Sequence, residues 1–267
     1  MEQLIKKRHR LILKWLAAAK GYIKEALATD FSVEQKTNPS DLVTEVDKKI
    51  EKYLVDRIKN KFPQDQILGE EGFGQRQVNI ARGTVWFLDP IDGTLNFVKQ
   101  GENFAVMIAV YDEGVGTQGY IYDVIKDQLF HAIIGHGVCC NGQLLSIPED
   151  LDIHEGLYAS SSIFYTGEKS LNDLHYEVAK MSLGVRPLGS AGLEAVEIAK
   201  SNIVAYTGRT LMPWDVAAPQ IILKEAGCLM TNLKGESPHL EGKEAILMGT
   251  PKAHATVLNK FKALVIE

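Results

Sequence analysis

The chain has 267 residues, of which 45% are hydrophobic and 24% charged, a composition typical of soluble globular proteins. Its net charge of −5 is spread along the sequence, which argues against nucleic-acid binding. No segment has the length and apolarity of a membrane span, and the start lacks the apolar core of a signal peptide. Three cysteines, two of them adjacent, form neither a disulfide framework nor a zinc pattern, so we expect a cytoplasmic protein.

The N-terminal part of the chain reads as two helices joined by a polar loop. Apolar residues at helical spacing predict a long helix from residue 3 to about residue 29 and another after residue 44. Thr44 is a candidate N-cap for the second helix, and Asp47 follows three residues later as in a capping box. The segment 29–40 between the helices is predicted to be a loop. Lys36 in this loop is either a surface lysine or part of a lid over an anionic site.

Acidic residues follow two short predicted strands in the central part of the chain. The strand 66–68 leads into Glu70, and the strand 84–88 ends at Asp89, because Pro90 cannot donate to a sheet ladder. Asp92 supplies another acid before a short predicted helix. Carboxylates are suitable ligands for hard cations, and the N–H groups at a helix start favour an anion. For an isolated pair of acids, the ordinary alternative is a turn in which they accept main-chain N–H groups.

The rest of the chain changes from antiparallel strands to alternating strands and helices. Strands are predicted at 104–111, 119–123 and 129–134, with a hairpin turn at Asn141-Gly142. After residue 148, strands at 156–160, 185–188, 203–206 and 245–248 alternate with helices at 171–181, 193–199 and 252–264. Asp215 is a candidate N-cap of a further helix, with Pro219 tolerated if it lies in the first turn. We therefore expect an α+β half, 1–148, and an α/β half, 149–267, packed as one compact unit.

Three motifs in this order resemble those of the inositol monophosphatase family, the magnesium-dependent and lithium-sensitive phosphatases. They are Gly69-Glu70-Glu71, Trp86-x-x-Asp89-Pro90-Ile91-Asp92-Gly93-Thr94-x-Asn96-Phe97 and Trp214-Asp215-Val216-Ala217-Ala218. The likeness extends from the Lys36 loop to the C-terminal helix. It implies a layered α-β-α-β-α sandwich, hydrolysis of a phosphate monoester, a homodimer and two or three Mg²⁺ ions.

Residue by residue, the resemblance also implies a site. The metal ligands would be Glu70, Asp89, the Ile91 carbonyl, Asp92 and Asp215, with Asp89 bridging two ions and Glu70 beside the attacking water. Thr94 would orient that water, and Asp47 would accept its proton through the Thr94 hydroxyl. The substrate would contact the N–H groups of Gly93 and Thr94, the segment Gly189-Ser190-Ala191, and Lys36 from the loop.

The resemblance leaves the substrate open at one position. Inositol-selective members place a glutamate seven residues before the aspartate of the last motif, and this chain has Gly208 there, followed by Arg209. Losing an acceptor for sugar hydroxyls should relax selectivity, and Arg209 is either a surface residue or a contact for a second phosphate. The leading interpretation is hydrolysis of inositol monophosphate and related small esters. The alternatives are an NADP phosphatase, a nucleotide 3′-phosphatase, a fructose-1,6-bisphosphatase and, from another class, a regulatory binding protein.

Overall fold

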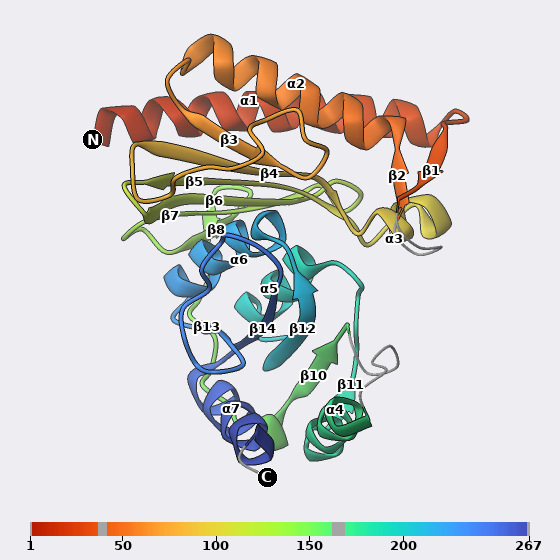
Figure 1. Cartoon of the computed structure of the whole chain (residues 1–267), viewed down its shortest axis with the longest axis vertical. Coiled ribbons are helices and arrows are strands. Elements are labelled where there is room, and N and C mark those ends of the chain that lie inside the picture. Colours follow the sequence, from red (N-terminus) through yellow and green to blue (C-terminus); the bar gives the residue numbers. More distant parts are fainter. Residues whose placement is uncertain (1, 37–41, 162–168, 266–267) are drawn as a thin grey trace.

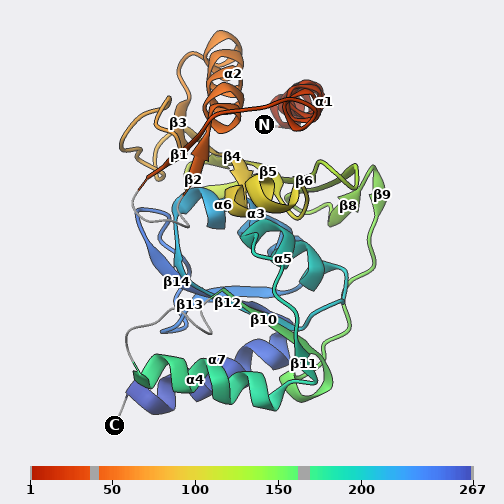
Figure 2. The same ribbon diagram turned by 90° about the vertical axis from the view of Figure 1, so that its right-hand side faces the viewer.

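Five layers of helices and sheets make up the structure, a computed structural model that describes residues 2–36, 42–161 and 169–265. From top to bottom in Figure 1 they are a helix pair, a seven-stranded sheet, a second helix pair, a five-stranded sheet and a third helix pair. Figure 2 shows the same order from the side, with the middle helices enclosed between the sheets. The expected layered sandwich is confirmed.

The seven-stranded sheet contains every strand of the expected first half except a small separate pair. Its order is β3-β4-β5-β6-β7-β8-β9, and all neighbours are antiparallel except β3 and β4. The bounds are β3 Gln66–Gly69, β4 Thr84–Asp92, β5 Ala105–Asp112, β6 Val115–Asp123, β7 Gln128–Ile133, β8 Val138–Cys140 and β9 Gln143–Leu144. The hairpin between β8 and β9 turns at Asn141 and Gly142, both at positive φ, as the Asn-Gly pair predicts.

Helices α1 (Glu2–Leu27) and α2 (Glu45–Lys61) cover the outer face of this sheet. The side chains of β5 point alternately to the two faces of the sheet. Because helices cover both faces, the sequence of this strand is apolar throughout. Val106, Ile108 and Val110 pack under α1 and α2, while Ala105, Met107 and Ala109 face the middle helices. The strand is therefore buried on both faces.

The five-stranded sheet is built from the second half of the chain in the order β11-β10-β12-β14-β13. It is mixed, with β10 parallel to β11 and β12 and β14 antiparallel to its neighbours. The bounds are β10 Leu157–Ser160, β11 Gly184–Val185, β12 Ala205–Leu211, β13 Leu229–Asn232 and β14 Glu244–Gly249. The 3-10 turn η1 (Ile153–Glu155) precedes β10, and helices α4 (Lys169–Met181) and α7 (Pro251–Val265) form the outermost layer. The division of the chain near residue 148 stays a prediction.

The middle layer consists of α5 (Ala191–Ala199) and α6 (Pro213–Glu225). Both belong to the second half of the chain, yet their apolar residues pack in one cluster with the inner face of the seven-stranded sheet. Of the helices in the described ranges, none is long and apolar enough to cross a membrane.

Several details differ from the sequence predictions. The strand β4 continues through Pro90 to Asp92 with a register shift after Asp89, because a bulge accepts a residue that cannot donate. The predicted loop 29–40 contains β1 (Val33–Gln35), which pairs with β2 (Leu42–Thr44); residues 37–41 lie outside the described ranges. The strand predicted at 185–188 is shorter, Gly184–Val185, because the chain then turns through Pro187 toward α5.

Helix α6 supplies two further corrections. Asp215 is not its N-cap: Met212 is, Pro213 is the first helical residue, and the Asp215 carboxylate accepts the Met212 N–H at 2.8 Å. Pro219 lies inside the helix rather than in its first turn. Because proline has no N–H, the carbonyl of Asp215 lacks its usual partner four residues ahead.

Candidate metal centre

Three carboxylates converge where β4 meets the start of α6. One oxygen each from Asp89, Asp92 and Asp215 lies within 4.8 Å of the other two. The bulge in β4 separates Asp89 from Asp92 and directs both side chains to this point, and the first turn of α6 brings Asp215 from the second half of the chain. Burial together with the charges of Glu70, Asp92 and Asp215 raises the pKa of Asp89 well above its ordinary value, and burial followed by the charge of Asp92 raises that of Asp215.

This donor set fits a hard divalent cation. Burying several carboxylates together is costly unless a cation or protons neutralise them. All the donors are oxygens, as Mg²⁺ prefers, and one oxygen from each carboxylate lies within 4.8 Å of the others, a bound near the ~4.2 Å between opposite ligands of an octahedral Mg²⁺ ion.

Asp92 also joins the two halves of the chain. Its Oδ1 accepts the N–H of Ala191 at 3.1 Å, and its Oδ2 accepts the N–H of Gly192 at 2.7 Å and the Ser190 hydroxyl. The carboxylate therefore lies at the N-terminus of α5, where unpaired N–H groups and the helix dipole favour negative charge. Burial nevertheless raises its pKa.

A short chain of hydroxyl and carboxylate groups lies beside the acids. The Thr94 hydroxyl is 3.1 Å from Asp47 Oδ1 and 3.0 Å from the Ile91 carbonyl oxygen, and it can donate to either. Asp47 is fully buried, and its other oxygen accepts the N–H and the hydroxyl of Thr44. The predicted capping box is confirmed, so Asp47 caps α2 with one oxygen and meets Thr94 with the other. Burial raises its pKa.

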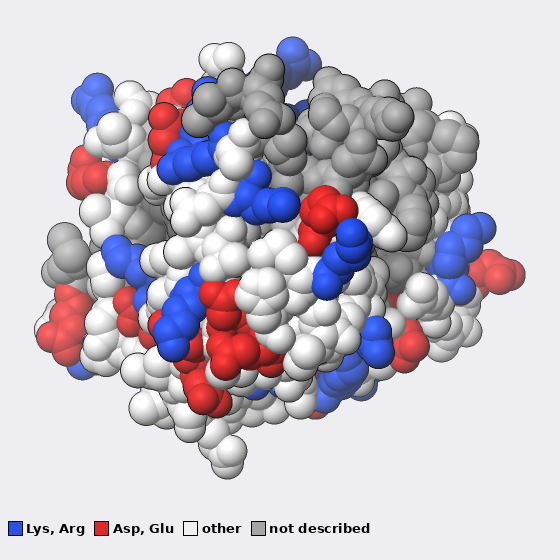
Figure 3. All heavy atoms as spheres, turned by 90° about the horizontal axis from the view of Figure 1, so that it is seen from below, with Lys and Arg blue, Asp and Glu red and all other residues white. Residues whose placement is uncertain are grey.

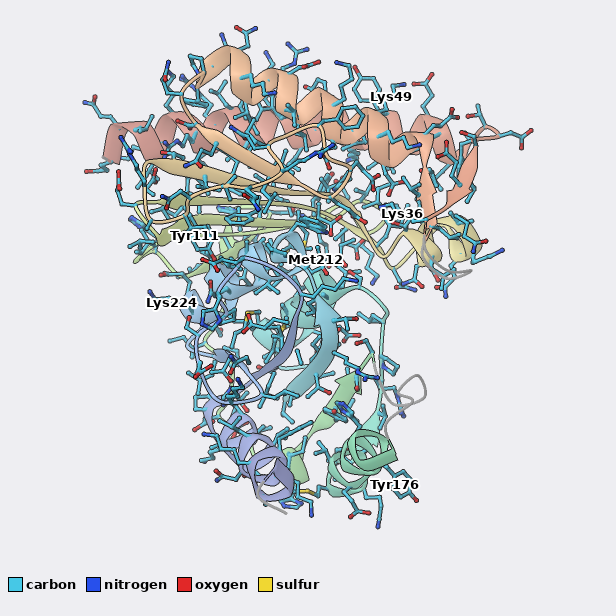
Figure 4. The ribbon with its side chains drawn as sticks, in the orientation of Figure 1. Lys36, Lys49, Tyr111, Tyr176, Met212 and Lys224 are labelled. Atoms are coloured by element: carbon cyan, nitrogen blue, oxygen red, sulfur yellow. The ribbon has the colours of Figure 1, made fainter. Side chains whose placement is uncertain are left out.

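Glu70 lies in the loop after β3 and is not one of the three clustered acids. Its charge is close enough to contribute to the raised pKa of Asp89, and Lys36 pairs with it. The Lys36 ammonium is 2.9 Å from Glu70 Oε1 and 2.6 Å from Glu71 Oε1. Burial disfavours the charged ammonium, but the Glu70 charge and the hydrogen bonds with both acids outweigh this and raise the pKa of Lys36. Burial also raises the pKa of Glu70, although the Lys36 charge opposes that rise. Figure 4 shows Lys36 and Met212 toward one end of α6 and Lys224 toward the other.

The segment before α5 is held from both sides. The Asn96 side-chain amide donates to the carbonyl oxygens of Leu188 and Asn103, each at 2.8 Å. Glu194 accepts the N–H groups of Leu188 and Gly189, and its other oxygen is buried without a hydrogen bond to any described residue. Gly189 and Ser190 consequently lie against Gly93, since a Cβ on Gly93 would be 3.3 Å from each of them.

The two remaining predicted residues, Gly208 and Arg209, lie on β12. Gly208 is enclosed, because a Cβ there would be 2.8 Å from the Leu211 side chain and 3.0 Å from the Tyr206 hydroxyl. The register of β12 against β14 shifts between Gly208 and Leu211, which places Arg209 in a bulge. Its charge is close enough to His175 to contribute, after burial, to the lowered pKa of that imidazole.

Sequence reasoning missed two buried acids near the site, Glu51 and Glu194. Glu51 is fully buried on α2, and Glu194 is 1% exposed on α5. Each is a charged residue within the apolar stripe of its helix, and that pattern is the signal that identifies them. The charge on the molecular surface does not mark a binding site on the face in Figure 3, because acidic and basic side chains are interspersed there.

Comparison with known sequences gives one consistent result. The sequence model described as "Inositol monophosphatase family" matches residues 7–265. An inositol-1-monophosphatase of Bacillus subtilis is 37% identical over 93% of this chain and 94% of its own length. A fructose-1,6-bisphosphatase/inositol-1-monophosphatase of Thermotoga maritima is 31% identical over 80% of each chain.

Solved structures give the same result. Inositol monophosphatase-II from Staphylococcus aureus superposes with a TM-score of 0.88 at 34% identity, covering 97% of both chains. The same enzyme, named SaIMPase-II, has been solved with inositol monophosphate and with 2′AMP. An IMPase/NADP phosphatase complexed with Mg²⁺ and phosphate superposes with a TM-score of 0.89 at 28% identity, over 96% of this chain and 95% of the other.

Proposed function

The chain belongs to the inositol monophosphatase family and is a phosphatase, and from that premise we propose a magnesium-dependent phosphomonoesterase acting on inositol monophosphate and related small esters. The convergence of Asp89, Asp92 and Asp215 carries this proposal, because two buried carboxylates and one half-buried carboxylate within 4.8 Å of one another suit the metal that the related structure holds. Glu70 and the Ile91 carbonyl would complete the ligand set. We retain two or three ions as the expected number.

When bound, the ions would supply activation of the attacking water and charge stabilisation of the leaving oxygen. The chain's own part is proton handling. The Thr94 hydroxyl can accept a hydrogen bond from water while donating its proton toward Asp47 Oδ1, 3.1 Å away. Burial raises the pKa of Asp47, which makes this carboxyl a better proton acceptor than an exposed one.

Substrate contacts would come from the main chain around Asp92. The N–H groups of Gly93 and Thr94 are proposed to bind phosphate oxygens, and Gly189-Ser190-Ala191 to line the space for the leaving group. Asn96 and Glu194 support this role, because they hold the main chain of Leu188 and Gly189 from opposite sides. Lys36 is proposed to act from the loop, where its ammonium could contact an anionic substrate.

A second candidate, a phosphatase for NADP or another nucleotide, is favoured by the geometry of β12. Position 208 is glycine, so no acidic side chain recognises sugar hydroxyls there. A Cβ at this position would be only 2.8 Å from the Leu211 side chain. Arg209 in the adjacent bulge offers a cation for a second phosphate. A nucleoside 2′-phosphate also binds a relative that is 34% identical. A cytoplasmic location and a homodimer remain part of the proposal.

Phosphate release from four substrates, with and without Mg²⁺, tests both candidates. The substrates are myo-inositol 1-phosphate, NADP, fructose 1,6-bisphosphate and 3′-phosphoadenosine 5′-phosphate, with Asp92→Asn as the blank. We expect turnover that needs both Mg²⁺ and Asp92, and its absence on all four would contradict the proposed substrate class. Arg209→Met should lower kcat/KM at least about tenfold for nucleotides while leaving myo-inositol 1-phosphate within about twofold.

A further inference from the structure

Glu51 is a fully buried acid that the mechanism above does not use. It lies on α2 one helical turn after Asp47, so both carboxylates project from the same face of the helix. Asp47 meets Thr94, whereas Glu51 meets the loop that follows β3. One helix therefore delivers two acids to two separate parts of the site.

Both oxygens of Glu51 bind the main chain of this loop. Oε2 accepts the N–H of Glu71 at 2.6 Å, and Oε1 accepts the N–H of Phe73 at 2.9 Å. The loop passes so close that a Cβ on Gly69 would be 2.5 Å from the Glu51 carboxyl carbon. Glycine at position 69 thus permits the carboxylate to reach the loop.

We propose that Glu51 is a positioning residue for Glu70 and sets the strength of metal binding without touching a metal. On one side of Glu70, its own N–H donates to the Leu88 carbonyl at 3.3 Å and so follows the register of β4. On the other side, Glu51 holds the N–H of the next residue, Glu71. The main chain of Glu70 is thereby fixed at both ends. The inference rests on the proposed role of Glu70 as a metal ligand.

The carboxylate of Glu51 indicates a specific role for this residue and not merely the filling of space in the protein interior. Burial raises the pKa of Glu51, and the nearby charge of Glu71 adds to that rise, so a carboxylate is unfavourable at this position. Of the side chains of this size, only a carboxylate accepts two N–H groups through two oxygens. A glutamine side chain would accept only one of the two N–H groups and would turn its own N–H₂ toward the other. One of the two hydrogen bonds that hold the loop would therefore be lost.

Glu51→Gln tests the proposal by calorimetric titration with Mg²⁺ in the absence of substrate. We expect the dissociation constant for Mg²⁺ to rise about tenfold, as for other residues that orient metal ligands. The Mg²⁺ concentration for half-maximal phosphate release should rise in parallel, with kcat at saturating Mg²⁺ within about threefold of wild type. The matched control is Glu225→Gln, because Glu225 also accepts two N–H groups, those of Gly135 and Gly137, each at 2.9 Å. Its Mg²⁺ binding should stay within about twofold of wild type.

Two further measurements keep the proposal falsifiable. Glu70→Gln should weaken Mg²⁺ binding at least as much as Glu51→Gln. If Glu70→Gln binds Mg²⁺ like wild type, the proposed ligand set fails and this inference with it. If only Glu51→Gln binds Mg²⁺ like wild type, this inference alone is wrong.

Hydrogen exchange on the wild-type protein needs no variant, and so it covers the case in which Glu51→Gln does not fold. The amides of Glu71 and Phe73 should be protected in EDTA, before any metal binds. Rapid exchange of both amides would overturn the proposal.

Discussion

Replacing Asp89 by asparagine should stabilise the metal-free protein and remove its response to Mg²⁺. Two unit charges no more than 4.8 Å apart repel by at least about 3 kcal/mol at an effective dielectric constant of about 20. The raised pKa of Asp89 means that protonation already relieves part of this repulsion. Asparagine keeps the acceptor for the Ile91 N–H, which is 3.0 Å from Asp89 Oδ1. We therefore expect a net gain of about 2 kcal/mol, or about 4–8 °C in Tm, at pH 8 in EDTA.

Scanning calorimetry in EDTA and in Mg²⁺ measures this effect. Wild type should gain about 2.7 kcal/mol when Mg²⁺ is present at one hundred times its Kd, whereas Asp89→Asn should gain almost nothing and release no phosphate. Asp112→Asn is the contrasting control, because the Asp112 carboxylate is 2.9 Å from the buried Arg8 guanidinium. Breaking that pair should cost about 3–5 kcal/mol in both buffers. A lower Tm for Asp89→Asn in EDTA, with a normal rise in Mg²⁺, would refute the reasoning.

Two more variants probe groups around the acids. Thr94→Val removes the hydroxyl that contacts Asp47 and Ile91. We expect kcat to fall about 10²-fold or more, while the Mg²⁺ affinity measured by calorimetry stays unchanged. An unchanged kcat would exclude the proton path through Thr94. At Glu194, burial raises the carboxyl pKa from 4.5 to about 7, so the folded state holds that proton more tightly than the unfolded chain. Its stabilising contribution is complete below about pH 4.5 and is lost as the pH rises to about 7. Glu194→Gln should therefore flatten the fall in Tm between about pH 5 and pH 8, and an equal slope in both proteins would contradict this.

The sequence was most informative where one local pattern decides a structure. The Asn141-Gly142 hairpin, the Thr44–Asp47 capping box and the layered fold followed from turn chemistry, capping and motif resemblance. The prediction that the strand ends before Pro90 is wrong, because a proline, which has no N–H, fits into a sheet either at a strand end or in a bulge. Pairing with β5 on both sides of Pro90 makes it part of a bulge.

Contacts between distant segments were beyond any local pattern. Asp215 looked like an N-cap, but Met212, the residue that follows β12, takes that position and makes Asp215 the third helical residue. The hydrogen bonds that the N–H groups of Ala191 and Gly192 donate to Asp92 join residues about one hundred positions apart. Glu51 and Glu194 show buried charge in apolar stripes, which signals a partner without identifying it.

The proline inside α6 has a practical consequence for labelling experiments. Pro219 has no N–H, so it cannot donate the usual helical hydrogen bond to the carbonyl of Asp215. The first turn of α6, which carries Asp215, therefore has one link fewer to the following turns. Disturbances in the last two turns should therefore be transmitted only weakly to Asp215. Lys224 is exposed at that far end (Figure 4), and Lys224→Cys gives a position for a fluorescent dye about 14 Å along the helix from Asp215. Cys139 and Cys140 are partly exposed and Cys228 is buried, so the two former would be replaced first.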